Sequence, residues 1–89
     1  PKSRRTLVSH LSLGRILLGP LDAPKGALAQ FQRYLKRGGP LTEQALVGKA
    51  HALKALGRRS EEIRAWKQLR TQFPDSLHTA EARRRLSQP

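Results

Sequence analysis

Apolar residues recur every three or four positions along most of the chain, which is the spacing of one side of an α-helix. In residues 43–56 they include Leu46, Ala50 and Leu53. A second run has them at the following positions: Ile63, Trp66, Leu69 and Phe73. Each of two such helices has one apolar stripe, which must be buried against the other helix and against a neighbouring pair. The pattern therefore predicts a helical hairpin over residues 41–74.

Glycine and proline mark the ends of the predicted helices. Gly57 lies between the two runs, where the end of a helix favours a residue that tolerates a left-handed backbone. Pro74 cannot continue the second helix and ends it. Gly19-Pro20 and Gly38-Gly39-Pro40 end two earlier helices in the same way.

The segments on either side of the hairpin predict three further helices, over residues 6–18, 24–37 and about 76–87. Proline is tolerated in a first helical turn, so Pro24 can begin the second of these. Thr42 is expected to cap the helix over residues 43–56, and Asp75 or Ser76 to cap the last helix. The helix after Gly57 is expected to begin at Ser60 or one or two residues earlier. No stretch alternates as a strand would, so the predicted fold class is all-α.

An internal repeat relates the helices to one another. Pro40 and Pro74 lie 34 positions apart, and each follows a helix. At a shift of 35, Phe31 corresponds to Trp66. Gly14 and Ala50 are small residues on the preceding helices. A period near 34 residues with a small residue, an aromatic residue and a closing proline resembles the tetratricopeptide repeat.

The resemblance covers about residues 7–86. Within the family, the chain most resembles tetratricopeptide segments of bacterial envelope proteins. Examples are the segments of iron-dicitrate-type sigma regulators and of Tol-Pal-associated coordinators. The matching motifs are Leu13-Gly14-Arg15, Tyr34-Leu35, Gly39-Pro40-Leu41, Leu56-Gly57-Arg58, Phe73-Pro74-Asp75-Ser76 and Ala82-Arg83. Glu62 departs from the family pattern, which usually has alanine there.

The resemblance implies a right-handed α-solenoid of antiparallel helix-turn-helix repeats. A basic flexible tail (residues 1–5) would precede repeat one (about 6–40), repeat two (about 41–75) and a capping helix (about 76–87). It also implies a bacterial protein of the periplasm or envelope rather than of the cytoplasm.

By the same resemblance, the first helix of each repeat lines a concave groove for a partner's peptide. The groove positions would be Val8, Leu11, Arg15 and Leu18 in repeat one, and Gln44, Val47, His51, Lys54 and Ala55 in repeat two. Arg15, His51 and Lys54 would donate hydrogen bonds to an acidic segment. The alternative is that Val8, Leu11 and Leu18 are core, Lys54 is only solvated and His51 is a partly buried packing residue.

The charge balance favours acidic partners. The chain has 89 residues, with 18 Lys and Arg against 6 Asp and Glu and a formal charge of +12. Nucleic acid, an anionic membrane surface and an acidic protein surface all fit this balance, unless the charge only forms a solvated basic surface. The candidate phosphate-binding residues on the outer side of the helices are Arg64, Lys67, Arg70, Arg83 and Arg84.

Enzyme, metal and cofactor chemistry find no support in the sequence. There is no cysteine, and the three histidines are far apart with few carboxylates near them. Glu61 and Glu62 are adjacent, so they point about 100° apart on a helix and form no acid-base pair. Trp66 and Phe31 lie on apolar stripes and favour core packing over base stacking. No apolar run approaches the ~20 residues of a membrane span.

Three functions follow as hypotheses. The first is a non-enzymatic adaptor without a cofactor, which recognises an acidic or peptide segment of a partner protein. The second is binding of nucleic acid or another anionic surface through the basic outer face. The third is a structural module that associates with itself, because two repeats leave apolar ends open. Since the chain contains no methionine, we expect it to be a fragment or a processed product.

Overall fold

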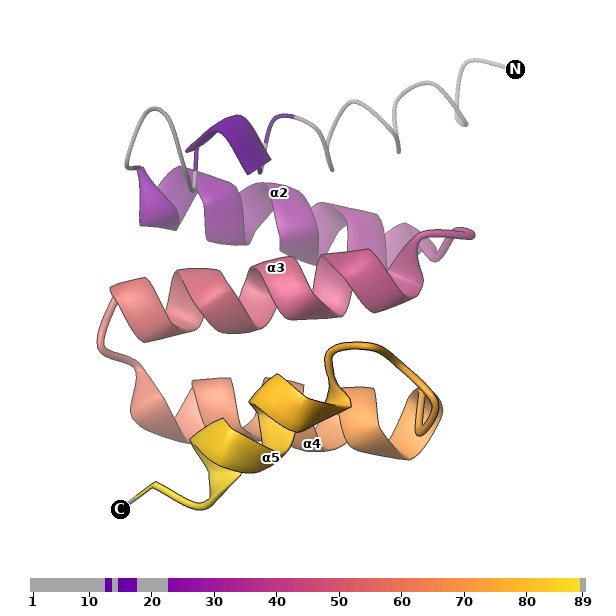
Figure 1. Ribbon diagram of the computed structural model, residues 1–89. Helices are drawn as coiled ribbons and strands as arrows, with labels where there is room; N and C mark the ends of the chain where they lie inside the picture. Colours follow the sequence, from indigo (N-terminus) through magenta and orange to yellow (C-terminus); the bar gives the residue numbers. More distant parts are fainter. Residues whose placement is uncertain (1–12, 14, 18–22, 89) are drawn as a thin grey trace.

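The computed structural model describes residues 13, 15–17 and 23–88 of the 89-residue chain. Four complete helices fill most of this part: α2 (Pro24–Arg37), α3 (Thr42–Ala55), α4 (Arg59–Gln72) and α5 (Thr79–Leu86). Residues 13 and 15–17 are helical as well, and the described part contains no β-strand. The all-α class predicted from the sequence is confirmed (Figure 1).

Proline and glycine begin and end the helices as predicted. Pro24 is the first residue of α2, which spans the residues expected of it. Gly38 follows α2 with φ 74°, and its N–H donates to the Tyr34 carbonyl. Gly57 has φ 71° between α3 and α4, in the left-handed region that glycine favours. Pro74 lies two residues after the end of α4.

Two of the predicted helix caps are wrong. Thr42 is the first residue of α3 rather than its cap, and its hydroxyl donates to the Gly39 carbonyl over 2.7 Å. Ser76 does not cap α5, which begins only at Thr79. Two successive turns occupy the intervening residues, because the Ser76 N–H donates to the Phe73 carbonyl and the Thr79 N–H to the Ser76 carbonyl. Helix α4 begins at Arg59, within the expected range of start positions.

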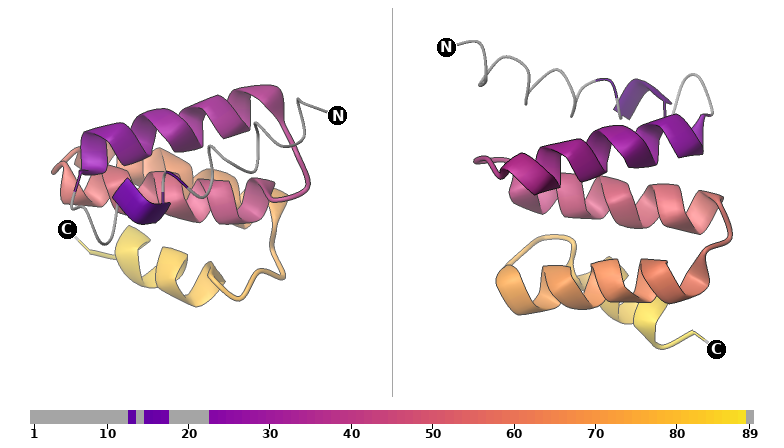
Figure 2. Two further views of the ribbon diagram at one scale, coloured as in Figure 1. Left: turned by 90° about the horizontal axis from the view of Figure 1, so that it is seen from above. Right: turned by 180° about the vertical axis from the view of Figure 1, so that it is seen from behind.

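Each complete helix packs against its neighbours in the sequence. The packed pairs are α2 with α3, α3 with α4 and α4 with α5. Consecutive helices α2, α3 and α4 run antiparallel, and α5 lies across the side of α4 (Figure 1). Seen from above, α2 and α5 lie on opposite sides of the molecule (Figure 2). Helix α3 is therefore the centre of the stack.

The core follows the apolar stripes predicted from the sequence. Trp66 and Phe31 are 0% and 1% exposed, so their predicted place in the core is confirmed. Gly48 of α3 makes room for Phe31, because a Cβ at Gly48 would lie 2.4 Å from the Phe31 ring. The Tyr34 hydroxyl is buried and accepts a hydrogen bond from the Leu41 N–H over 2.7 Å. Within the described residues, no helix combines the length and the apolar character needed to cross a membrane.

Candidate binding surface

Helix α3 is the helix with the most buried residues in the described part of the chain. Its buried residues surround most of its circumference, and they are Ala45, Leu46, Val47, Gly48, Ala50, Ala52 and Leu53. Gln44, His51 and Lys54 lie within about 100° of one another around the helix axis. Gln44 and Lys54 are exposed and His51 is half-buried. We call these three residues the α3 strip, because they lie on one side of α3 and none of them is fully buried.

The other predicted groove residues have different surroundings. Val47 lies on the same side of α3 but is only 7% exposed, so its side chain packs in the core. Ala55 is exposed at the end of α3, and Arg15 is exposed on the helical residues that precede α2. Val8, Leu11 and Leu18 lie outside the described residues.

His51 has contacts within the chain. Its Nε2 lies 3.0 Å from Glu81 Oε2 on α5. Its ring meets the ring of Trp66 on α4 edge-on, with centroids 5.6 Å apart and planes at 67°. The imidazole therefore joins three helices, and a partner that reached the α3 strip would meet His51 and Glu81 together.

Glu62 is the centre of a buried ionic cluster. It is 1% exposed, and one carboxylate oxygen accepts from Trp66 Nε1 over 2.8 Å and from Arg85 Nε over 2.7 Å. The other oxygen accepts from Arg85 Nη2 over 2.9 Å and from Arg59 Nη1 over 3.4 Å. Arg59 also donates to the carbonyls of Arg85 and Gln88. The cluster fastens α5 to α4.

The cluster keeps Glu62 ionised. The pKa of the Glu62 carboxyl is lowered to about 2, and the hydrogen bonds from Arg85 are the largest cause of this shift. Burial acts in the opposite direction and raises the pKa. Glu62 in turn raises the pKa of Arg85. A carboxylate with this pKa, with donors on both oxygens, holds no proton to give near neutral pH. We therefore assign Glu62 a structural role.

The cationic residues predicted for an outer face are all at the surface. Arg64, Lys67 and Arg70 of α4 are exposed, as are Arg83 and Arg84 of α5. A second cationic group, which was not predicted, lies on α2. Its members are exposed as well, and they are Lys25, Arg33, Lys36 and Arg37. The signal was in the sequence, because the segment that forms α2 has four cations and no Asp or Glu.

Most acidic residues in the described part of the chain already have a partner. The contacts are Glu43 with Ser76, Glu61 with Arg58, Glu62 with Arg85 and Arg59, and Glu81 with His51. Asp75 is exposed in the turn before α5. The exposed cations of α2 and α4 consequently have no carboxylate partner among the described residues.

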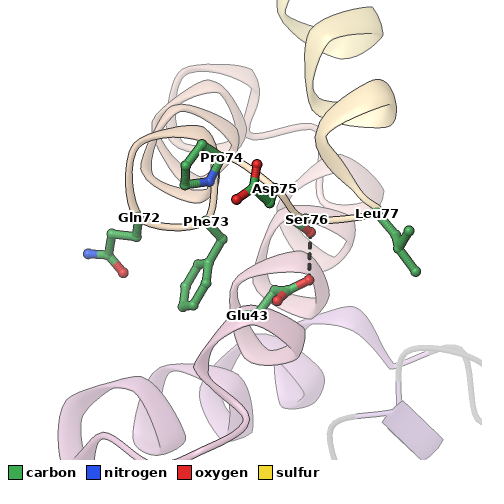
Figure 3. A pocket seen from close by; sticks show the side chains of 7 residues that line it. All are labelled: Glu43, Gln72, Phe73, Pro74, Asp75, Ser76 and Leu77. Atoms are coloured by element: carbon green, nitrogen blue, oxygen red, sulfur yellow. Dashed lines mark hydrogen bonds between the residues drawn. The ribbon is translucent and has the colours of Figure 1, made fainter.

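A hollow of about 420 Å³ lies at the turn between α4 and α5, lined by Glu43 and by residues 72–77 (Figure 3). The Ser76 hydroxyl donates to Glu43 across it over 2.6 Å. Leu77 is 95% exposed and points outward. Glu43 and Asp75 give the hollow an acidic lining, so it suits an acidic segment less well than the α3 strip does.

Groups of three or more His, Asp or Glu side chains placed to hold a metal ion do not occur among the described residues. Comparison of the chain with protein-family models, with curated proteins and with solved structures finds no match.

Proposed function

We propose that the chain is a non-enzymatic interaction module, built of tetratricopeptide-like repeats, that binds an acidic segment of a partner protein along the α3 strip. The observation that carries the proposal is the burial of α3. Gln44 and Lys54 of the α3 strip are exposed, and His51 is half-buried, on a helix whose other residues are mostly buried. In stacked helical repeats, the partner is bound by the helices of the concave side.

The order of packing supports the repeat architecture. Helices α2 to α5 pack only in sequence order, each complete helix against the next. Stacking of this kind is typical of solenoids, in which each unit contacts only its neighbours. In the proposed assignment, α3 and α4 form repeat two, α2 completes repeat one and α5 is the capping helix.

Charge supports an acidic partner. Lys54 is exposed and has no carboxylate partner among the described residues. Arg15 adds a second exposed cation on the residues before α2. His51 Nε2 is 3.0 Å from Glu81 Oε2, so the Glu81 carboxylate already has a partner within the strip. Binding at this strip requires no rearrangement of the core.

The proposal is tested by titrating the chain with two fluorescent peptides of equal length, one rich in Glu and one with Gln in place of every Glu. We expect the acidic peptide to bind more tightly. Lys54→Glu should weaken its binding about tenfold, or about 1.4 kcal/mol, through like-charge repulsion. The matched control is Lys25→Glu, which makes the same charge change on α2. Equal binding of the two peptides, or an equal loss from both variants, would contradict the proposal.

A further inference from the structure

Helix α2 has cations along its whole exposed side. Lys25, Arg33, Lys36 and Arg37 are exposed. The buried residues lie on the opposite side of the helix, and they are Ala27, Leu28, Gln30, Phe31 and Tyr34. The helix contains no acidic residue that could neutralise these cations. We call the four cations the α2 row.

Helix α4 repeats the arrangement. Arg64, Lys67 and Arg70 are exposed at intervals of three residues, and we call them the α4 row. The only acids of α4 lie in its first turn. Glu62 is buried with Arg85, and Glu61 pairs with Arg58 over 2.8 Å. The α4 row is therefore as free of neighbouring anions as the α2 row.

The two rows belong to helices that run in the same direction on either side of α3 (Figure 2). Neighbouring helices pack about 8–10 Å apart, so the axes of α2 and α4 are at most about 20 Å apart. The inner side of α4 is covered by α3 and α5, and that of α2 by α3 and by Leu17, which lies against Gly26. The exposed side of α4 is consequently turned away from α3 and α5, and that of α2 away from α3 and Leu17.

The rows lack what a protein partner or an unstacked base would need. Protein interfaces depend on buried aromatic or apolar anchors, whereas the exposed residues among the cations of these helices are polar, such as Gln32, Gln68 and Thr71. Single strands bind by stacking on aromatic rings. Three of the four aromatic residues, Phe31, Tyr34 and Trp66, are at most 1% exposed. Phosphate groups need only cations, and guanidinium groups suit them best.

We propose that the α2 and α4 rows form a docking surface for the phosphate backbone of duplex nucleic acid, without preference for base sequence. A duplex presents one negative charge per about 1.7 Å of its axis, so it supplies many anions to dispersed cations. At about 3.4 Å of axis per base pair, a duplex of about 20 base pairs is about 68 Å long, so one duplex lying across α2 and α4 is long enough to reach both rows. This surface is separate from the α3 strip and does not depend on the binding of a protein segment there.

The test measures binding of the full chain to a labelled duplex of about 20 base pairs by fluorescence anisotropy, between about 50 and 200 mM salt. If all seven cations contact phosphates, log affinity should fall with log salt at a slope near −6. One variant replaces Arg33, Lys36 and Arg37 by Gln, and another replaces Arg64, Lys67 and Arg70 by Gln. Each should reduce the slope by about 2.7, because three phosphate contacts are lost.

A matched control variant removes three cations elsewhere, with Lys54→Gln, Arg83→Gln and Arg84→Gln. Its slope should stay within about one unit of the unmodified chain. A second duplex of unrelated sequence should bind equally well, and a single strand should bind more weakly. Three results would overturn the proposal. The slope could change as much in the control variant as in the row variants, or it could stay the same in one of the row variants. Polyglutamate could also displace the labelled duplex as well as unlabelled duplex does.

Exposed Gln is a good helix former, so the row variants should fold. Far-ultraviolet circular dichroism and the emission of Trp66 check this before binding is measured. Binding of an acidic peptide to the α3 strip should be unchanged in both row variants, so failure of one proposal can be told from failure of the other.

Discussion

At the scale of single residues, Glu62 shows how a charged side chain can be buried in a packed core. Its two oxygens accept hydrogen bonds from the indole of Trp66 and the guanidinium groups of Arg85 and Arg59. A buried carboxylate is tolerated only when it is paired and hydrogen-bonded in this way. No buried polar side-chain atom in the described part of the chain lacks a partner.

The stability of the chain should therefore fall in acid. The pKa of Glu62 is lowered from an ordinary 4.5 to about 2. Its ionisation thus contributes about 3 kcal/mol of stability above about pH 5, and this is lost progressively as the pH falls to about 2. The free energy of unfolding in urea, measured between pH 7 and pH 2, should show this decrease.

The control for this prediction is Glu62→Gln, which cannot ionise. At pH 7, the free energy of unfolding of this variant should be lower than that of the unmodified chain. Between pH 7 and pH 2, it should decrease by about 3 kcal/mol less than that of the unmodified chain. The other carboxylates are the same in both proteins, so the difference isolates Glu62. An identical pH dependence in the two proteins would show that Glu62 is not held by Arg85.

Gly48 is the second residue on which the packing depends. A Cβ at this position would lie 2.4 Å from the Phe31 ring, which is 1% exposed and cannot move freely. Gly48→Ala should therefore lower the free energy of unfolding by about 1–3 kcal/mol, although alanine favours a helix. Thermal or urea unfolding at neutral pH measures the effect.

The Phe31→Leu background provides the comparison for Gly48→Ala. Because the smaller side chain removes the ring from this contact, the same substitution should cost at least about 1 kcal/mol less there. Equal costs in the two backgrounds would mean that Phe31 is not the side chain that excludes a Cβ from position 48.

At the scale of elements, α5 is held by a few specific bonds. Arg85 donates from Nε and Nη2 to both oxygens of Glu62, which a lysine ammonium cannot do. Arg85→Lys should therefore loosen α5, with amide hydrogen exchange in α5 faster by about tenfold or more. The emission of Trp66 should also shift to longer wavelength, because its indole shares the same carboxylate.

Two internal comparisons make this result specific. Arg84→Lys changes an exposed neighbour and should leave exchange in α5 as it is. Helices α2 and α5 do not pack together, so exchange in α2 should stay the same in both variants. A uniform change in all helices, or no change in α5, would contradict the role of Arg85.

Helix boundaries could be predicted where local backbone chemistry decides them. Pro24, Gly38 and Gly57 act through their own φ preferences, and the predicted ends of the helices next to them agree with the structure. The start of α5 could not be predicted in this way. Ser76 bonds to Glu43, 33 positions earlier in the chain, and this contact exists only after α3 and α4 have packed.

The same distinction applies to the candidate surface. The helical period places Gln44, His51 and Lys54 on one side of α3, and in the structure Gln44 and Lys54 are exposed and His51 is half-buried. The contact of His51 with Glu81 could not be predicted, because the two residues lie 30 positions apart in the sequence. They belong to α3 and α5, and each of these helices packs against α4. The bond of Glu62 to Arg85, over 23 positions, escaped prediction for the same reason.

At the scale of the whole molecule, sequential packing predicts uneven stability. Helix α3 has neighbours on both sides, whereas α5 is eight residues long and packs against α4 alone among the complete helices. In such stacks the stability of an element depends on its own interfaces. Native-state hydrogen exchange should therefore be slowest in α3 and α4 and fastest in α5. Equal protection of all four helices would instead indicate a single cooperative unit.

The most direct test of the proposed function is to map an acidic peptide onto the chain by NMR, which suits a protein of 89 residues. We predict that the amide shifts of Gln44, His51 and Lys54 change as the peptide is added, and that the changes saturate as expected for one site. Changes confined to the α2 and α4 rows, or no change in α3 at saturating peptide, would contradict a binding site on the α3 strip.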